Sequence, residues 1–185
     1  AGRDLPEARH LIREKRYEHA DAILERVITR DPENIGAWAI RDICWRLIGD
    51  PRSEWLHGQP GLIAAHDLGF DAAGVEEMAA FLRSLHHHEQ HPVGQSMRGG
   101  TQTRGKLLSR IEPKVLELRG AISEAVMKHW HDLPAFDGQH PLLRHRNKQP
   151  TLSGSWSVRL AGGGHHVGHI HPEGVLSSAS YWVVP

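Results

Sequence analysis

The segment YEHADAILERVITRDP (residues 17–32) decides the fold of the first part of the chain. Apolar or small residues recur along it at intervals of three and four, which is the period of a helix with one buried face. The pattern ends at Asp31-Pro32, because proline disfavours a helical conformation in the residue before it. We therefore expect one helix here, packed against neighbouring helices.

Similar patterns lie on both sides of this segment. Ala8, Leu11 and Ile12 predict a preceding helix, and a tight turn at residues 15–17 separates it from the helix in residues 17–32. A further helix is expected after Asn34, and it ends at Gly49-Asp50-Pro51. Its apolar residues are Trp38, Ile40, Ile43, Cys44, Trp45 and Leu47.

This order of helices resembles a tetratricopeptide repeat. The large, small and proline positions of that motif are occupied by Tyr17, Ala20, Leu24, Val27 and Pro32. A small residue such as Ala20 lets two helices approach closely. The resemblance implies a protein partner bound through the helices, and one repeat alone cannot bury its own face. Any amphipathic helical hairpin would show the same periodicity.

Residues 51–150 are predicted to be a helical connector. One helix is expected over residues 71–85, with Asp71 as its N-cap, and a longer one over residues 106–130, with Pro113 marking a break or a new first turn. The glycine-rich residues 93–105 are expected to form a loop. Three histidines, His86, His87 and His88, close the first helix and His91 follows; they are interpreted as a solvated helix end, with a metal site as the alternative.

The apolar period changes to two after residue 150. We expect strands at residues 156–160, 165–171 and 175–184, with turns at residues 162–164 and 172–174. Helices followed by strands indicate an α+β fold. The predicted division is residues 1–50 for the repeat-like helices, 51–150 for the connector and 151–185 for the strands.

Two histidines in the second predicted strand are candidate metal ligands. Side chains two apart share a face of a strand, so His169 and His171 can approach one ion. Iron(II) and zinc both accept neutral imidazole. The same spacing also occurs among partly exposed polar residues, so it does not prove a site. His165 and His166 are expected to be loop residues or to surround the ligands.

Several separated stretches together resemble a family of 2-oxoglutarate- and Fe(II)-dependent oxygenases that is often joined to tetratricopeptide repeats. They are GHHVGHIHP (164–172), GSWSVRL (154–160), LSSASYWVVP (176–185), QSMRGGTQT (95–103), GDPR (49–52) and WL (55–56). The resemblance implies a double-stranded β-helix (jelly roll), Fe(II), and 2-oxoglutarate as co-substrate. It makes His169 the first metal ligand and places His171 where many relatives have a carboxylate.

The same resemblance suggests residues around the metal. Tyr181 and Arg159 could line the co-substrate pocket, or be a core aromatic and a solvated strand arginine. Gln102 and Thr103 could contact substrate, or belong to the loop that leads into the next helix. A third metal ligand and a basic anchor for 2-oxoglutarate are expected beyond residue 185, so the given chain is expected to be an inactive, weakly iron-binding fragment. No catalytic residue is assigned.

Composition limits the remaining function classes. Lys+Arg and Asp+Glu are equal at 22 each, which argues against nucleic acid or an anionic membrane as partners. The one cysteine, Cys44, cannot form an internal disulfide, and we expect a cytoplasmic protein. The alternatives to an oxygenase are a cupin-like metal protein without 2-oxoglutarate and a non-enzymatic interaction module.

Overall fold

The computed structural model describes residues 2–86 and 96–184, and these residues form an α+β fold of helices with a small antiparallel sheet. The chain divides into two compact units, each made of three segments. Unit 1 contains Ala1–Ala64, Asp132–Gln149 and Ile170–Ser177; unit 2 contains Ala65–His131, Pro150–His169 and Ser178–Pro185. Neither unit is a continuous stretch of the chain, because both are completed by later segments.

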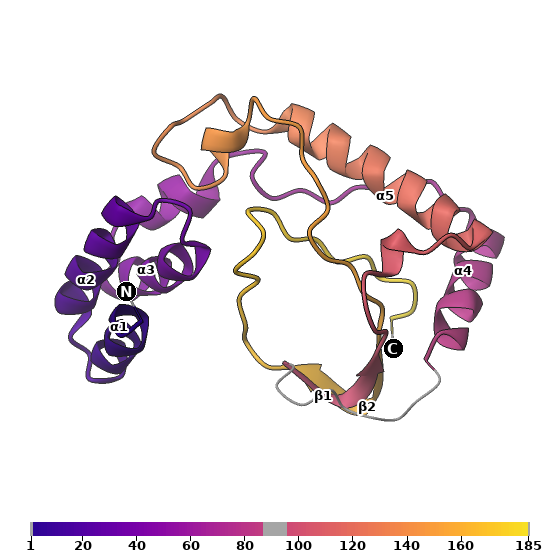
Figure 1. Ribbon diagram of the computed structural model, residues 1–185, viewed down its shortest axis with the longest axis horizontal. Helices are drawn as coiled ribbons and strands as arrows, with labels where there is room; N and C mark the ends of the chain where they lie inside the picture. Colours follow the sequence, from indigo (N-terminus) through magenta and orange to yellow (C-terminus); the bar gives the residue numbers. More distant parts are fainter. Residues whose placement is uncertain (1, 87–95, 185) are drawn as a thin grey trace. The chain divides into compact units, whose positions relative to one another are not determined.

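Unit 1 begins with three helices, drawn in indigo and violet in Figure 1: α1 (Asp4–Arg13), α2 (Tyr17–Arg30) and α3 (Ile35–Ile48). Helix α2 packs against both α1 and α3. Each helix places a fully buried alanine in the shared core, at Ala8, Ala20 and Ala37. The absence of larger side chains there allows the helices to approach closely, as the periodicity of residues 17–32 predicts.

The ends of α3 follow the sequence signals. The Asn34 side chain accepts a hydrogen bond of 3.0 Å from the Ala37 amide, and Gly49 ends the helix with a φ of 69°, which favours glycine. Two of the apolar residues predicted for this helix, Ile43 and Leu47, are 46% and 53% exposed. They lie one turn apart and form an uncovered apolar strip on α3.

The rest of unit 1 consists of short elements. The π-helix η1 (Glu54–Gly58) follows α3, and the 3₁₀-helix η3 (Leu143–His145) belongs to the second segment of the unit. Leu56 and Leu143 are buried. Ile170, from the third segment, packs against the core of α1, α2 and α3.

Unit 2 has a separate core between α4 (Ala72–Ser84), the 3₁₀-helix η2 (Leu107–Ser109) and α5 (Pro113–Asp132), whose last residue falls in unit 1. The Asp71 carboxylate caps α4 by accepting from the Gly74 amide at 2.8 Å, as predicted. Pro113 is the first residue of α5, so the break expected there is confirmed. The buried residues of this core are Met78, Leu82, Leu107, Leu108, Val115 and Leu118.

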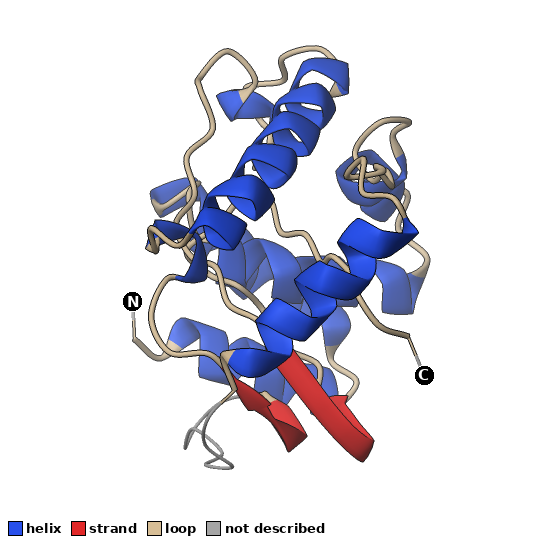
Figure 2. Cartoon of the chain, turned by 90° about the vertical axis from the view of Figure 1, so that its right-hand side faces the viewer, coloured by secondary structure: helices blue, strands red, loops and turns tan. Residues whose placement is uncertain are grey.

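The sheet of unit 2 pairs β1 (Met97–Gln102) with β2 (Val158–His166) in antiparallel orientation, shown in red in Figure 2. The loop predicted for residues 93–105 is therefore wrong for residues 97–102. Glycine-rich segments have low intrinsic strand propensity, but pairing with a distant partner overrides it. Residues before 96 in this stretch, and His87, His88 and His91, lie outside the described residues.

The predicted turn at residues 162–164 is a bulge within β2. Arg98 pairs with His165 and Gly100 with Leu160, so Gly99 lies opposite four residues, 161–164. A side chain on Gly100 would collide with the backbone of Arg159. The three glycines of β2 interrupt the ladder as expected, but the chain then rejoins the same partner strand.

Of two further strand predictions, the one for residues 165–171 holds only for residues 165–166, and the one for residues 175–184 is wrong. β2 ends at His166, and residues 167–171 are not in a strand; residues 175–184 also form no strand. The later segment is held instead by Trp182, whose ring packs edge-on against Phe70 at a centroid distance of 5.0 Å. Among the described residues, no helix combines the length and apolar character needed to cross a membrane.

Candidate functional site

The loop after β2 carries the histidines predicted to bind metal. His169 is exposed, and its Nδ1 lies 2.9 Å from the carbonyl oxygen of Val167. A carbonyl oxygen only accepts hydrogen bonds, so Nδ1 carries the proton and, in the neutral ring, Nε2 carries the lone pair. This tautomer is the one that metal-bound histidines commonly show, with a backbone carbonyl fixing the ring.

The sheet holds this loop at its start. The Val167 amide donates to the Ser96 carbonyl at 2.9 Å, which extends the ladder by one bond past β2. Ser96 Oγ also lies 3.0 Å from Nδ1 of His166. The rings of His166 and His169 are stacked, with centroids 5.6 Å apart. His166 and His169 are therefore neighbours, because β2 ends at His166 and the alternation of strand faces does not extend to residue 169.

The other predicted ligand, His171, is half-buried and lies in the segment Ile170–Ser177 of unit 1, whereas His169 ends a segment of unit 2. Its carbonyl accepts from the Gly174 amide at 3.3 Å in a turn. Within residues 2–86 and 96–184, no group of three or more His, Cys, Asp or Glu side chains is placed to hold a metal ion.

The residues suggested for the co-substrate pocket are on the surface. Tyr181 is 80% exposed, so it is not enclosed in a pocket. Arg159 is exposed in β2, opposite Thr101. Gln102 is half-buried at the end of β1. Thr103 Oγ1 accepts from the Ser157 amide at 2.9 Å, so its hydroxyl supports the backbone of the neighbouring segment.

His86 is not solvated as expected for the end of the helix. It is half-buried, and its two ring nitrogens contact hydroxyl groups of the sheet region: Nδ1 lies 2.8 Å from Thr101 Oγ1 and Nε2 lies 3.1 Å from Ser157 Oγ. The side chain therefore connects the segment after α4 to β1 and to the residue that precedes β2.

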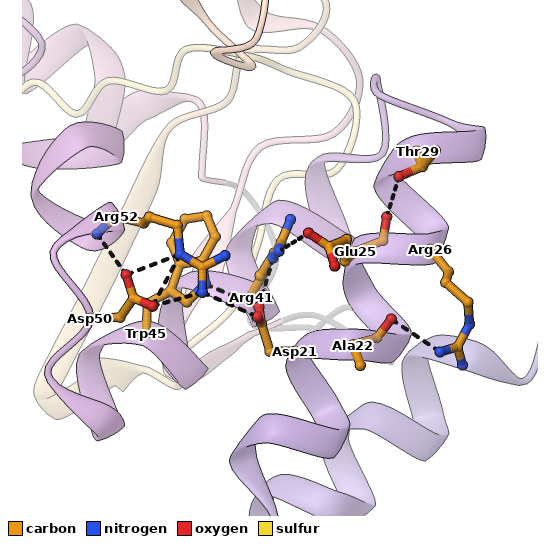
Figure 3. Close-up of polar contacts among 9 residues, drawn as sticks. All are labelled: Asp21, Ala22, Glu25, Arg26, Thr29, Arg41, Trp45, Asp50 and Arg52. Atoms are coloured by element: carbon orange, nitrogen blue, oxygen red, sulfur yellow. Dashed lines mark hydrogen bonds and ion pairs between the residues drawn. The ribbon is translucent and has the colours of Figure 1, made fainter.

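Unit 1 contains a polar cluster that the sequence analysis did not identify (Figure 3). The Arg41 side chain of α3 donates through Nε to Asp21 Oδ1 at 2.7 Å and through Nη2 to Glu25 Oε1 at 2.9 Å. Asp21 also accepts from the Trp45 indole at 3.0 Å. Arg41 is only 5% exposed, and a guanidinium is rarely buried so deeply unless it is paired.

A second arginine joins the cluster from the turn after α3. Arg52 donates to Asp50 through its backbone amide and through Nε and Nη2, and Nη2 also contacts Asp21 at 3.3 Å. Its hydrogen bonds lower the pKa of Asp50 to about 2. Both guanidinium groups lie over the Trp45 ring, at 4.9 Å for Arg41 and 4.8 Å for Arg52.

A pocket of about 520 Å³ lies beside this cluster, entirely within unit 1. Its walls include Trp38, Trp45 and Trp55, and the guanidinium-bearing residues Arg41, Arg52 and Arg144. The GDPR and WL stretches quoted above contribute Arg52 and Trp55. A signal was therefore present in the sequence, but periodicity alone could not show that these residues meet α2 and the segment around residue 144.

Cys44, beside the cluster on α3, has no exposed surface. Burial, assisted by the nearby Asp21 charge, raises the pKa of its thiol to about 11. The thiol therefore stays protonated near neutral pH and is a poor nucleophile.

Comparisons of the chain with models of known protein families, with curated proteins and with solved structures give no match.

Proposed function

We propose that the chain is part of an Fe(II)- and 2-oxoglutarate-dependent oxygenase, in which His169 and His171 contribute metal ligands. The observation that carries this proposal is the hydrogen bond from His169 Nδ1 to Val167 O, which fixes the tautomer that metal-bound histidines commonly show. The oxygenase-like sequence around both histidines supports the choice of metal and co-substrate.

The donor set agrees with Fe(II) in chemical type. Neutral imidazole is a good ligand for Fe(II), and a site with two protein nitrogens retains positions for a third ligand and a co-substrate. When bound, Fe(II) and 2-oxoglutarate would supply the hydroxylation of a C–H bond by O2, with one oxygen atom entering the substrate and the other entering succinate as the co-substrate loses CO2.

The role of this chain's own residues is to orient the first ligand. The Val167 amide is tied to Ser96, and the Val167 carbonyl sets the tautomer of His169. The ring of His166 is stacked on that of His169 and limits access to the face of the His169 ring that it covers. Ordering a ligand before the metal arrives reduces the entropy lost on binding.

The test is a calorimetric titration of the whole chain with Mn(II), followed by anaerobic Fe(II). Substituting His169→Ala or His171→Ala should weaken binding by about tenfold or more. His19→Ala, which removes an exposed histidine of α2, is the matched control and should not change the affinity. Equal metal affinity in all three variants and the unchanged chain would refute the proposal.

Addition of 2-oxoglutarate separates the oxygenase from a cupin-like metal protein. The keto acid chelates a metal through its keto and carboxylate oxygens, so it should tighten Mn(II) binding. Succinate lacks the keto oxygen and should not have this effect. Histidine-dependent metal binding that is insensitive to 2-oxoglutarate would favour the cupin-like alternative.

A second candidate is a helical interaction module of the tetratricopeptide type. It is favoured by the fully buried alanines Ala8, Ala20 and Ala37, one on each of the three helices, and by the exposed strip of Ile43 and Leu47 on α3. In that case, binding of a protein partner through unit 1 should be unaffected by His169→Ala and His171→Ala. Loss of partner binding in these variants would argue against an independent module.

A further inference from the structure

The sheet of unit 2 (Figure 2) and its flanking loops carry positive charge without acidic residues. Residues 96–111 and 150–169 contain no aspartate or glutamate. Their lysine and arginine residues are Arg98, Arg104, Lys106, Arg110 and Arg159. The equal totals of 22 acidic and 22 basic residues, which argue against nucleic acid as a partner, are an average over the whole chain and do not describe this region. A local excess of positive charge attracts anionic partners even when the total charge is zero.

Three of these cations are exposed and are not neutralised by neighbouring groups. The side chains of Arg104, Lys106 and Arg159 form no hydrogen bond or ion pair with any other described residue. Arg110 differs, because its guanidinium pairs with Glu112. Exposed cations are often only hydrated, so their charge alone does not define a site. The position of Arg104 and Lys106 beside an exposed aromatic ring is a second, independent feature.

Arg104 and Lys106 belong to a short loop with fixed ends, residues 103–107, which we call the basic loop. The amide of Thr103 donates to the Ser157 carbonyl at 3.0 Å, and the amide of Leu107 donates to the Ser155 carbonyl at 2.8 Å. Both donor residues are buried, whereas the three residues between them are exposed. The basic loop therefore presents its two cations from buried and hydrogen-bonded ends.

An exposed tryptophan lies between these two anchoring bonds. Trp156 separates Ser155 from Ser157, whose carbonyls accept the bonds from the basic loop, and it is 41% exposed. Its six-membered ring approaches Gly154 so closely that a Cβ there would lie 3.1 Å from Cζ3. The backbone at residue 154 supports this part of the indole. Tryptophan is common at interfaces because its ring offers a large apolar surface to a partner.

The third exposed cation lies on the other face of the sheet. The ring of His86 contacts the hydroxyl groups of Thr101 and Ser157, so these two side chains share one face. Arg159 pairs with Thr101 in the ladder and lies on the same face as its partner. Side chains alternate along an extended segment, so Trp156 lies on the opposite face from Ser157. Arg159 therefore adds to the local charge without belonging to the group around Trp156.

A flat ring beside two cations matches the chemistry of a single-stranded nucleic acid. Each nucleotide combines a base that can stack on an indole with a phosphate that accepts from arginine and lysine. An acidic peptide would pair with the cations, but it has no flat ring next to each charge. In a duplex the bases are stacked inside and cannot reach Trp156 without being flipped out.

We propose that the basic loop and Trp156 bind single-stranded nucleic acid, with one base stacked on Trp156 and the adjoining phosphates at Arg104 and Lys106. The contact with Gly154 orients the ring before binding, and the buried ends of the loop hold the cations near it. This reduces the ordering that binding requires. The proposal does not depend on the metal site, and none of these residues is a proposed metal ligand.

The test uses the whole chain and the fluorescence anisotropy of a labelled oligothymidylate at low ionic strength. Binding should weaken as salt is added, with a log–log slope of about −1 to −2, since two phosphates on a single strand release their counterions. Unlabelled oligothymidylate should displace the probe. Polyglutamate of equal charge and duplex DNA should displace it much less.

Substitutions identify where the strand binds. Trp156→Ala should weaken binding by about tenfold, and Trp156→Phe should restore part of the loss because phenylalanine also stacks. Arg104→Gln and Lys106→Gln should each weaken binding and make the salt slope shallower by about 0.7. Arg159→Gln removes the same charge from the other face and should have a smaller effect. Arg26→Gln, on α2 in unit 1, should have none.

The outcomes decide the proposal, provided that circular dichroism shows each variant to be folded. Loss of binding in Trp156→Ala, with partial recovery in Trp156→Phe and larger effects at residues 104 and 106 than at residue 159, supports it. It is overturned if no oligothymidylate binds or if Trp156→Ala binds as well as the unchanged chain. Equal effects of all four charge substitutions, or displacement by polyglutamate as complete as that by unlabelled oligothymidylate, would show non-specific attraction of anions and overturn it as well.

Discussion

Replacing His140 by alanine is expected to destabilise unit 1 by about 3–5 kcal/mol. The imidazole is 2% exposed and uses both nitrogens. Nε2–H donates to the Leu56 carbonyl at 3.1 Å, while Nδ1 accepts from the Leu142 and Leu143 amides at 3.1 and 3.2 Å. The ring also packs edge-on against Trp55 at 5.0 Å.

The magnitude follows from these contacts. Three hydrogen bonds contribute about 0.5–1.5 kcal/mol each, and their loss leaves buried backbone groups without partners. Removing the ring also creates a cavity beside Trp55, which adds to the loss. A surface histidine has neither effect, so His19→Ala should change the stability by less than about 0.5 kcal/mol.

The same geometry predicts a dependence on pH. Burial lowers the pKa of His140 below its usual 6.5, in spite of the hydrogen bond to Leu56. Because the folded pKa is below the unfolded one, the full contribution of this group to stability is present above pH 6.5. It is lost as the pH falls from there toward the folded pKa, since only the unfolded state then takes up a proton. This one group can change the free energy of unfolding by no more than about 1.4 kcal/mol per pH unit.

Peptide-resolved hydrogen exchange is the suitable assay, because it reports the opening of unit 1 separately from that of unit 2. Amides of the segment around Leu142 and Leu143 should exchange much faster in His140→Ala than in the unchanged chain at pH 7. On lowering the pH from 7 to 5, after correction for the intrinsic exchange rate, protection should fall in the unchanged chain. The reasoning is refuted if the amides around Leu142 and Leu143 are as protected in His140→Ala as in His19→Ala. It is also refuted if protection depends on pH in the same way in both variants.

Three further results are expected. Asp50→Asn should destabilise unit 1 by about 1–2 kcal/mol at pH 7, a value discounted for solvent screening because Arg52 is 45% exposed. Because the pKa of Asp50 is about 2, this contribution to stability is lost as the pH falls from about 4 toward 2. Acid unfolding curves measured by circular dichroism that are identical in the two proteins would contradict this. Gly100→Val should break the pairing of β1 with β2, because the new side chain meets the Arg159 backbone; hydrogen exchange of residues 97–102 checks this, with preserved protection as the contrary result. Cys44 should react with a thiol reagent at pH 8 only after unfolding, since its pKa is about 11 and it is fully buried; rapid labelling of the folded chain would be inconsistent with this.

The helices were predictable because their signals are local. Asn34 and Asp71 cap helices with the adjacent backbone, and Pro113 marks a first turn through its own fixed φ. The sheet was only partly predictable, since the pairing of residues 97–102 with residues 158–166 depends on close backbone approach between distant glycines. No periodicity in either segment encodes that approach.

The candidate sites were also only partly predictable from the sequence. The spacing of His169 and His171 in the sequence indicates a candidate metal site in this loop. The tautomer of His169, however, depends on the direction of a backbone carbonyl, which only the structure shows. Arg144 is far from Arg41 and Arg52 in the sequence, and each of the three looks like an ordinary surface residue. Their assembly around one pocket depends on the packing of α2 with α3 and of the second segment of unit 1.

The interleaving of segments has a consequence for biosynthesis. The helices α1, α2 and α3 are translated before Leu143 and Ile170, which belong to the same unit and follow about a hundred residues or more later. During elongation on the ribosome, part of the apolar surface of these helices therefore stays exposed until the later segments are synthesised. Chaperones recognise such exposed apolar surface. Shortened versions of this chain that stop near residue 150 should consequently be recovered in poorer yield than the entire sequence.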